Sequence, residues 1–376
     1  MDERVAALTT DDLLKPVCHA LSTHNVKIDA WHINQLLGGT GSAIGGTALY
    51  CLWGKTTQQQ HWSLILKVLN ERPKEAVTSP YYWKREFNLY ESSLLEGMPV
   101  SGIRPPRIDG CVDHGSSCWV WMEDVQFSKG TWTLPTYESV ARGLGRFSGA
   151  FIAGQSIPDA PWLADHWHCQ IIDDLGPTFE TLADHLQQPL VQRALPADAK
   201  ETILTIWQNR NRYRDVLYDM PQTLCHNDAF PQNLLNNGDE FVLIDWALAG
   251  HGAIGEELTS LVSLSLYSDP SSVRAEKLDQ IVFDGYVAGL RDAGWQGSRT
   301  LARLGYTCAM TLRGLAGVAQ DIRALSDEAS LRTLHPHMDL DRVGELADLY
   351  ASVRRFRLLR MAAEADELMK DTEVGA

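Results

Sequence analysis

The sequence predicts an α+β fold in two lobes, a mostly antiparallel β lobe with one main helix followed by a larger helical lobe. Its 376 residues exceed the length at which a single hydrophobic core usually stops growing. Short apolar runs typical of strands predominate up to about residue 125, and apolar residues at helical spacing predominate after it. We therefore expect an N-terminal lobe of residues 1–125 and a C-terminal lobe of residues 126–376.

The composition of the chain limits where the protein is expected in the cell and which kinds of partner it is expected to bind. The chain has 44% apolar and 22% charged residues, as globular proteins do. No apolar run approaches the ~20 residues of a membrane span, and no signal-type apolar core starts the chain, so we expect a cytoplasmic protein. Seven cysteines without a CxxC pair indicate reduced thiols. The formal charge of −15 disfavours nucleic acid and anionic membranes as partners. No pattern decides the oligomeric state.

A short helix and three strands are the first predicted elements. Apolar residues at helical spacing predict the helix within residues 9–22, and Pro16 is tolerated only in a first turn, so we expect it to start near Lys15. Strands follow at residues 31–37, 46–53 and 61–69. A glycine-rich segment, 38–46, joins the first two, and its backbone amides can cradle an anion. The segment does not complete GxGxxG, and a flexible hairpin loop is the alternative interpretation.

Lys67 is the one charged residue within the apolar third strand, so its ammonium group must reach solvent or an anion. Residues 82–96 then predict a helix with an apolar stripe. Glu86 and Glu91 both flank the stripe, and spacing alone does not decide which of them faces Lys67.

A hairpin of residues 107–112 and 118–122 leads to the connection between the lobes. A helix over residues 136–155, with Thr136 as its N-cap, and a helical region over 157–220 follow. His166, His168 and Cys169 suggest a metal site within that region. Because no second ligand pair has zinc-site spacing, we do not favour one.

The polar residues that suggest chemistry are concentrated between residues 223 and 252. Asn237-Gly238 between two apolar runs predicts a β-hairpin. This hairpin would bring Asp228, Asn233 and Asp245 to one place, and their oxygens suit Mg²⁺. For any one of them a capping or turn role is the commoner interpretation, so the prediction depends on all three together.

His226-x-Asp228-x-x-x-x-Asn233, followed by Ile244-Asp245-Trp246, resembles the catalytic segment of the aminoglycoside phosphotransferase and choline kinase superfamily. The resemblance implies a bilobal, protein-kinase-like fold. It also implies that Asp228 accepts the proton of a substrate hydroxyl, while Asn233 and Asp245 hold Mg²⁺ against ATP. His-Asn-Asp is nearer to choline and ethanolamine kinases, and Ile-Asp-Trp is nearer to the aminoglycoside branch, so the acceptor is left open.

The resemblance further implies nucleotide-binding roles in the first lobe. Lys67 would contact the α- and β-phosphates, and Glu86 would pair with it, because the family places its acidic residue there. Backbone groups of Glu123 and Val125 would bind adenine, with GTP as the alternative nucleotide. The glycine-rich segment would cradle the phosphates through Gly39, Thr40, Gly41 and Ser42.

One departure from the family concerns the support of the catalytic loop. Gly255-Glu256-Glu257 stands where the family usually has an Asp, and either glutamate could take that role. Helices over residues 275–293, 300–325 and 343–369 complete the chain, with His335-Pro336-His337 between the last two.

The predicted function is ATP-dependent phosphorylation of a hydroxyl on a small molecule, such as an aminoglycoside, a macrolide, a choline-like amine, a sugar or a biosynthetic metabolite. A protein kinase is disfavoured, because Asp-Trp-Ala replaces Asp-Phe-Gly and no Ala-Pro-Glu follows. A pseudokinase or nucleotide-binding scaffold is the alternative from another class. Acidic and aromatic residues of the second lobe favour a cationic acceptor. The acidic candidates are Asp165, Asp173, Asp174, Glu180, Glu256 and Glu257, beside Trp162 and Trp167.

Overall fold

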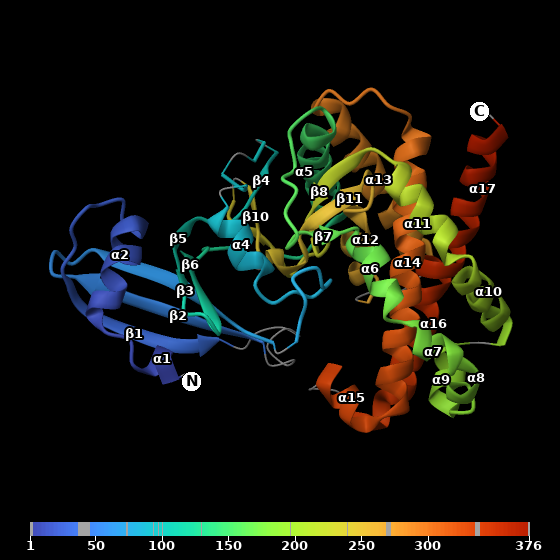
Figure 1. The fold of residues 1–376 in the computed structure, drawn as a ribbon, viewed down its shortest axis with the longest axis horizontal. Coiled ribbons are helices and arrows are strands. Elements are labelled where there is room, and N and C mark those ends of the chain that lie inside the picture. Colours follow the sequence, from blue (N-terminus) through green and yellow to red (C-terminus); the bar gives the residue numbers. More distant parts are fainter. Residues whose placement is uncertain are drawn as a thin grey trace.

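The computed structural model describes residues 3–374 apart from 37–45, 73, 93, 97, 100, 129, 196, 239, 268–271 and 335–338. A β-sheet with a few short helices forms one lobe, and a larger group of helices forms the other (Figure 1). This is the two-lobed α+β arrangement that the sequence predicts. No helix in the described part of the chain is both long and apolar enough to cross a membrane.

The first lobe is built on a five-stranded sheet in the order β1-β2-β3-β6-β5, with every neighbouring pair antiparallel. These strands and the predicted hairpin lie within a few residues of where the sequence places them. Helix α1 (Glu3–Ala6) precedes the sheet. The strands are β1 (Ile28–Leu36), β2 (Thr47–Thr56), β3 (His61–Asn70), β5 (Ile108–Asp113) and β6 (Ser117–Glu123).

The two faces of this sheet pack against different helices. Leu64 and Leu66 of β3 belong to the apolar cluster under α2 (Thr10–Ala20). Ile65 and Leu69 of the same strand pack in the cluster that contains α4 (Arg85–Glu91). Because side chains alternate along a strand, Lys67 lies on the α4 face.

The prediction that the first helix starts near Lys15 is wrong. Helix α2 begins at Thr10, so Pro16 lies inside it. The Asp12 carboxylate accepts the Thr9 amide at 2.8 Å, which caps the helix ahead of the proline. Proline removes one helical hydrogen bond. Burial of Leu13 and Val17 against the sheet offsets that cost.

Helix α14 (Arg299–Ser326) lies at the centre of the second lobe, where it contacts most of the shorter helices. Two other long helices, α5 (Leu134–Ile152) and α13 (Ser272–Asp292), pack closely against each other because Gly289 has no side chain, and a Cβ there would lie 2.0 Å from the Arg142 carbonyl oxygen. The predicted N-cap Thr136 is wrong. Thr133 caps α5 and accepts the Thr136 amide at 3.4 Å, because Pro135 occupies the first turn.

Shorter helices surround this centre. The predicted helix over residues 343–369 is present as two α-helices joined by a π-helical segment, Arg355–Arg360. The long helical region predicted over 157–220 is divided, in the part that the structure describes, into six short helices. The helices that surround the centre are α6 (Trp167–Asp173), α7 (Gly176–Glu180), α8 (Leu182–His185), α9 (Pro189–Ala194), α10 (Ala197–Gln208) and α11 (Arg210–Asp219) from that region, and α12 (Leu258–Ser265), α15 (Glu328–Leu334), α16 (Val343–Arg354) and α17 (Met361–Val374) from later in the chain.

Two small sheets position the residues between 223 and 252. One has the order β4-β10-β9 and the other β7-β11-β8. The predicted hairpin is β9 and β10, and its turn includes Gly238 with a φ of +106°. Strand β4 precedes residue 125 yet pairs with β10, so the first part of the sequence contributes to the second lobe. The strands are β4 (Ile103–Arg104), β7 (Ala164–Asp165), β8 (Gln222–Cys225), β9 (Leu234–Asn236), β10 (Phe241–Leu243) and β11 (Gly250–Ala253).

Candidate active site

Asp228 and Asn233 lie on the loop between β8 and β9 and contact each other directly. The Asn233 side-chain amide donates to the Asp228 carboxylate at 2.9 Å and to the Asp228 carbonyl at 3.0 Å. The Ile244 amide donates to the Asn233 carbonyl at 2.9 Å, so the hairpin brings the end of β10 to this loop. Asp245 follows directly, with a left-handed φ of 66° that Asp tolerates better than most residues.

His226 joins the Asp228 loop to the Asp245 segment. Its Nε2 lies 3.0 Å from the Ile244 carbonyl, and its Nδ1 lies 3.1 Å from the Asp228 amide. A neutral ring that donates from Nε2 and accepts at Nδ1 satisfies both contacts. Burial lowers the pKa of His226 to about 4, which keeps the ring neutral.

Lys67 bridges the two lobes through two carboxylates. Its Nζ lies 2.5 Å from Glu86 and 2.7 Å from Asp245. Glu91 is exposed, so the structure joins Lys67 to Glu86. Burial alone would lower the pKa of Lys67, but the two carboxylates have the larger combined effect and raise it above its usual value. Lys67 in turn lowers the pKa of Asp245. Lys67 and Glu86 are buried, whereas the Asp245 side chain is 47% exposed and can meet a ligand.

Asp228 contrasts with Asp245, because its carboxylate has no ion pair within 4.0 Å among the described residues. Burial raises its pKa to about 7, against the opposing effect of the cationic Arg313 on α14. A carboxylate with a pKa close to neutrality is suited to exchange a proton with a ligand.

The oxygen donors fit a hard divalent cation. Asn233 Oδ1 and Asp245 Oδ2 have no hydrogen-bond partner among the residues that the structure describes. Amide and carboxylate oxygens are ligands that Mg²⁺ prefers. No cluster of three His, Cys, Asp or Glu residues in the described ranges could hold a metal ion by itself. A cation here would therefore need further oxygens from a ligand such as a phosphate group.

Sequence comparison identifies the family. The model of the phosphotransferase enzyme family matches residues 102–299, which is more than half of the chain and includes Asp228, Asn233 and Asp245. The chain belongs to this family. It is a small-molecule phosphotransferase that acts on hydroxyl acceptors.

Solved structures agree with this fold at low sequence identity. The amicoumacin kinase hAmiN, in complex with AMP-PNP, Ca²⁺ and Ami, is 13% identical, with a TM-score of 0.56 over 94% of this chain and 96% of that one. A choline kinase from Cryptosporidium parvum Iowa II is 11% identical, with a TM-score of 0.51 over 91% of each chain. Comparison with curated proteins found no match.

Glu257 of the phosphotransferase supports the loop that carries Asp228. Its carboxylate accepts the His226 amide at 2.6 Å and the Asn227 amide at 3.4 Å. Burial raises the pKa of Glu257 to about 8, while these amides lower it in part. The sequence alone does not decide whether Glu256 or Glu257 supports this loop. In the structure the turn at Gly255, with a φ of +88°, directs Glu257 to it.

Glu256 has a different role, which also accounts for the two histidines. Its carboxylate lies 3.3 Å from His166 Nδ1 and 2.9 Å from His168 Nδ1. Burial alone would raise the pKa of Glu256, but the two histidines lower it well below its usual range. This cluster is a buried hydrogen-bond network within the phosphotransferase, with no metal-binding group among the described residues.

Arg85 is a residue that sequence reasoning missed. Its buried guanidinium donates to the carbonyls of Trp162 at 2.7 Å and Ala247 at 2.9 Å. It also donates to Ser79 and Pro80 in the loop before α4. Burial lowers its pKa to about 10. Arg85 therefore fixes α4, which carries Glu86, to the segment just after Asp245. In the sequence, only its position next to Glu86 indicates this role.

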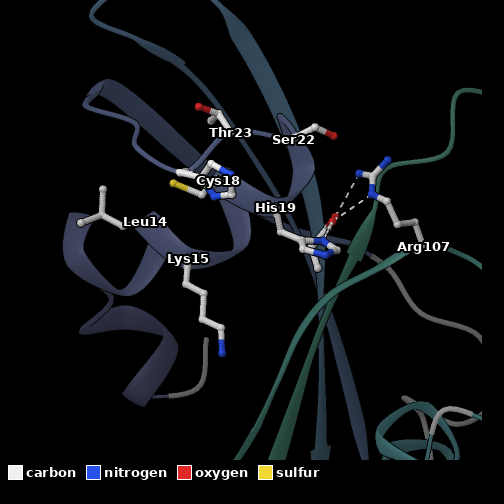
Figure 2. A pocket seen from close by; sticks show the side chains of 9 residues that line it. Leu14, Lys15, Cys18, His19, Ser22, Thr23 and Arg107 are labelled. Carbon is white, nitrogen blue, oxygen red and sulfur yellow. Dashed lines mark hydrogen bonds and ion pairs between the residues drawn. The ribbon is translucent and has the colours of Figure 1, made fainter.

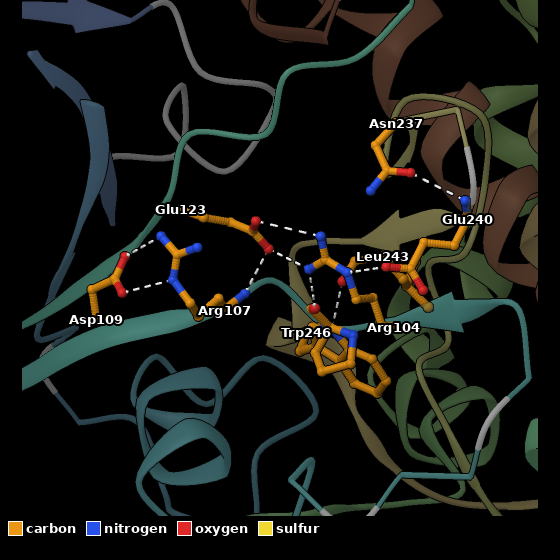
Figure 3. Close-up of polar contacts among 9 residues, drawn as sticks. Arg104, Arg107, Asp109, Glu123, Asn237, Glu240, Leu243 and Trp246 are labelled. Atoms are coloured by element: carbon orange, nitrogen blue, oxygen red, sulfur yellow. Dashed lines mark hydrogen bonds and ion pairs between the residues drawn. The ribbon is translucent and has the colours of Figure 1, made fainter. Parts of the chain in front are cut away.

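The connection between the lobes is held by charged side chains (Figure 3). Arg104 of β4 forms an ion pair with Glu123, at the end of β6, and lies 2.5 Å from Glu240 in the β9–β10 turn. Glu123 also accepts the Arg107 amide at 2.7 Å. The Val125 amide has no described hydrogen-bond partner. Gly39, Thr40, Gly41 and Ser42 lie outside the described residues.

A separate pocket lies between α2 and β5 (Figure 2). His19 and Arg107 line it, and both bind the buried Asp109 carboxylate at 2.8 Å. None of the described residues predicted for the phosphotransferase site lines this pocket.

Proposed function

We propose that this phosphotransferase transfers the γ-phosphoryl group of ATP to a hydroxyl of a small molecule, with Asp228 as the base. The observation that carries the proposal is the joined network in which His226 connects the Asp228 loop to Asp245, while Lys67 connects Asp245 to Glu86. A scaffold without turnover needs none of Asp228, Asn233 and Asp245. Their shared position therefore favours turnover over a pseudokinase.

The proposed reaction balances with the groups of this site. The acceptor oxygen attacks the γ-phosphorus, the bond from that phosphorus to the β–γ bridging oxygen breaks, and ADP leaves. Asp228 accepts the hydroxyl proton, for which its pKa of about 7 is suitable. Phosphoryl transfer depends mainly on positioning and charge neutralisation, so these few side chains suffice.

We propose that Lys67 and the backbone of Glu123 and Val125 bind the nucleotide. The family resemblance adds Gly39, Thr40, Gly41 and Ser42. Asn233 and Asp245 would hold Mg²⁺, which when bound neutralises phosphate charge. The AMP-PNP and Ca²⁺ in the hAmiN structure support a nucleotide and a divalent cation here. We favour ATP, with GTP as the alternative.

The test is release of ADP or GDP in the presence of Mg²⁺ and a panel of hydroxylated acceptors. The panel should include an aminoglycoside, a macrolide, choline, sugars and hydroxy acids. We expect ATP turnover with at least one acceptor, and its loss in Asp228→Asn while nucleotide binding persists. Tight binding of ATP without transfer to any acceptor would contradict the proposed function and favour a pseudokinase.

A further inference from the structure

Arg313 is held beside the Asp228 loop by helix α12. Its Nε donates to the Ser263 hydroxyl at 3.0 Å. One turn earlier on α12, Ser260 donates to the carbonyl of Asn227 at 2.6 Å. Residues three positions apart share one face of a helix, so α12 brings Arg313 and the residue preceding Asp228 to the same face.

Arg313 has only neutral hydrogen-bond partners. Besides Ser263, its Nη1 lies 3.4 Å from His168 Nε2, and the guanidinium lies 5.7 Å from the centre of the Trp167 ring. His168 already uses Nδ1 on Glu256, and burial lowers its pKa, so its Nε2 is an acceptor. The Nη2 group of Arg313 has no hydrogen-bond partner within the described ranges.

A second arginine increases the positive charge at this place. Arg357 is 6% exposed and donates to the Tyr267 hydroxyl at 3.1 Å and to the Arg313 carbonyl at 3.3 Å. Neither arginine has a carboxylate within 4.0 Å among the described residues. Burial lowers the pKa of Arg313 to about 10. By contrast, Arg303 on the same helix α14 binds two carboxylates, those of Asp279 and Glu364.

The carboxylates that favoured a cationic acceptor are engaged elsewhere or solvated. Glu256 binds two histidines and Glu257 binds the loop amides. Asp173 pairs with Arg214 at 2.6 Å. Asp165, Asp174 and Glu180 are exposed. The charge with the largest effect on the pKa of Asp228 is therefore the positive charge of Arg313. A partly buried cation without a counterion is costly unless a ligand supplies one.

We propose that the acceptor carries an anionic group, such as a carboxylate, that binds the guanidinium of Arg313 while its hydroxyl faces Asp228. The planar fork of a guanidinium matches a carboxylate. Tyr81 lies with its ring 5.9 Å from that of Trp167, so these two aromatic side chains would flank the acceptor next to Arg313. This inference rests on the proposed function and names the substrate class of the same site.

The experiment uses the full chain with Mg²⁺ and AMP-PNP at matched ionic strength. Thermal unfolding is measured with gluconate, sorbitol and glucamine, and with glycerate, glycerol and 3-amino-1,2-propanediol. Within each set the other hydroxyls stay the same, and one terminal group changes from a carboxylate to a neutral hydroxymethyl or a cationic aminomethyl group. Arg313→Gln is compared with Arg299→Gln, which removes the same charge from the exposed start of α14. For any acid that is turned over, the KM is measured in both variants.

We expect the acids to raise the unfolding temperature of the wild type and of Arg299→Gln, but not of Arg313→Gln. The KM for an acid should rise by roughly 10- to 100-fold in Arg313→Gln, as loss of a charged hydrogen bond predicts. An equal response to the amines or neutral alcohols, no response to the acids, or an unchanged response in Arg313→Gln would overturn the anion site. Absence of stabilisation by AMP-PNP itself would instead contradict the proposed function.

Discussion

The two sides of the site differ in how their charges are balanced. On the Lys67 side, the Lys67 ammonium group lies 2.5 Å from Glu86 and 2.7 Å from Asp245. On the Asp228 side, Asp228 and Arg313 have no ion pair within 4.0 Å to any described residue. The pKa directions agree with this contrast, since Lys67 lowers that of Asp245, whereas burial raises that of Asp228 to about 7.

The contrast separates charged groups that fix the positions of structural elements from charged groups that are available to a ligand. A paired, buried cluster fixes the position of its members, here the strand β3, the helix α4 and the segment after β10. Asp228 and Arg313 are partly buried without an ion pair, which reduces stability, and proteins retain such charges mainly where function requires them. The predictions that follow test each half of this contrast.

The largest expected effect is on the Asp228 side. Asp228→Asn keeps the shape of the side chain but removes its ability to accept a proton. Turnover should fall by roughly 10²-fold or more, with nucleotide affinity retained. Steady-state ADP release and equilibrium nucleotide binding measure the two effects. Near-normal turnover in a folded variant would remove Asp228 from the role of base.

The second effect is on the Lys67 side and concerns the metal. Asp245→Ala should weaken Mg²⁺-dependent nucleotide binding by about 10-fold or more, and Asn233→Ala by less, because only Asp245 supplies charge. Calorimetric titration with ATP, with and without Mg²⁺, measures the difference. Equal affinities for the wild type and both variants would contradict the metal role.

Support of the catalytic loop gives the third effect. Glu257→Ala removes the acceptor of the His226 and Asn227 amides, so turnover should fall by roughly 10-fold. Glu257→Gln keeps an acceptor oxygen and is the matched control, with activity within a few-fold of the wild type. If both variants lose activity equally, the charge of Glu257 matters and the positioning role is wrong.

A smaller effect is expected at the connection between the lobes shown in Figure 3. Arg104→Gln breaks the contacts of Arg104 with Glu123 and Glu240, which are partly exposed and therefore weak. The KM for ATP should rise by about two- to five-fold, with little change in kcat. Arg107→Gln, whose side chain binds Asp109 instead, should leave the KM for ATP unchanged.

The smallest effect is on stability. The folded pKa of Asp228, about 7, lies above the usual 3.8, so ionisation costs stability as pH rises from about 4 to 7. Asp228→Asn should therefore raise the unfolding temperature by a few °C at pH 8, and by less at pH 5. A variant less stable than the wild type at pH 8 would contradict the sign of this effect.

The Lys67 side was largely predictable from the sequence. The alternation of side chains along β3 places Lys67 on the face that packs against α4. The hairpin predicted from Asn237-Gly238 brings Asn233 to the start of the Asp245 segment. Glu86 required the family resemblance, because Glu91 has similar spacing. These are local patterns within regular elements, which is why a single sequence carries them.

The Asp228 side was less predictable, because its contacts are distant in sequence. Arg313 lies in a long helix among mainly buried neighbours, and only the packing of α12 brings it near Asp228. Whether Glu256 or Glu257 supports the loop depends on one turn at Gly255. The error at Pro16 had a local cause, since the Asp12 contact to Thr9 starts α2 earlier than proline statistics suggest.

The most direct test is a pH titration of the aspartate carboxyl carbons by ¹³C NMR, with Asp228→Asn and Asp245→Asn used to assign the two signals. It needs no knowledge of the acceptor. Asp228 should titrate near pH 7, and Asp245 should titrate below its usual value of 3.8. If Asp228 titrates at or below 3.8 while Asp245 titrates near neutrality, the division into a paired and an unpaired side is wrong.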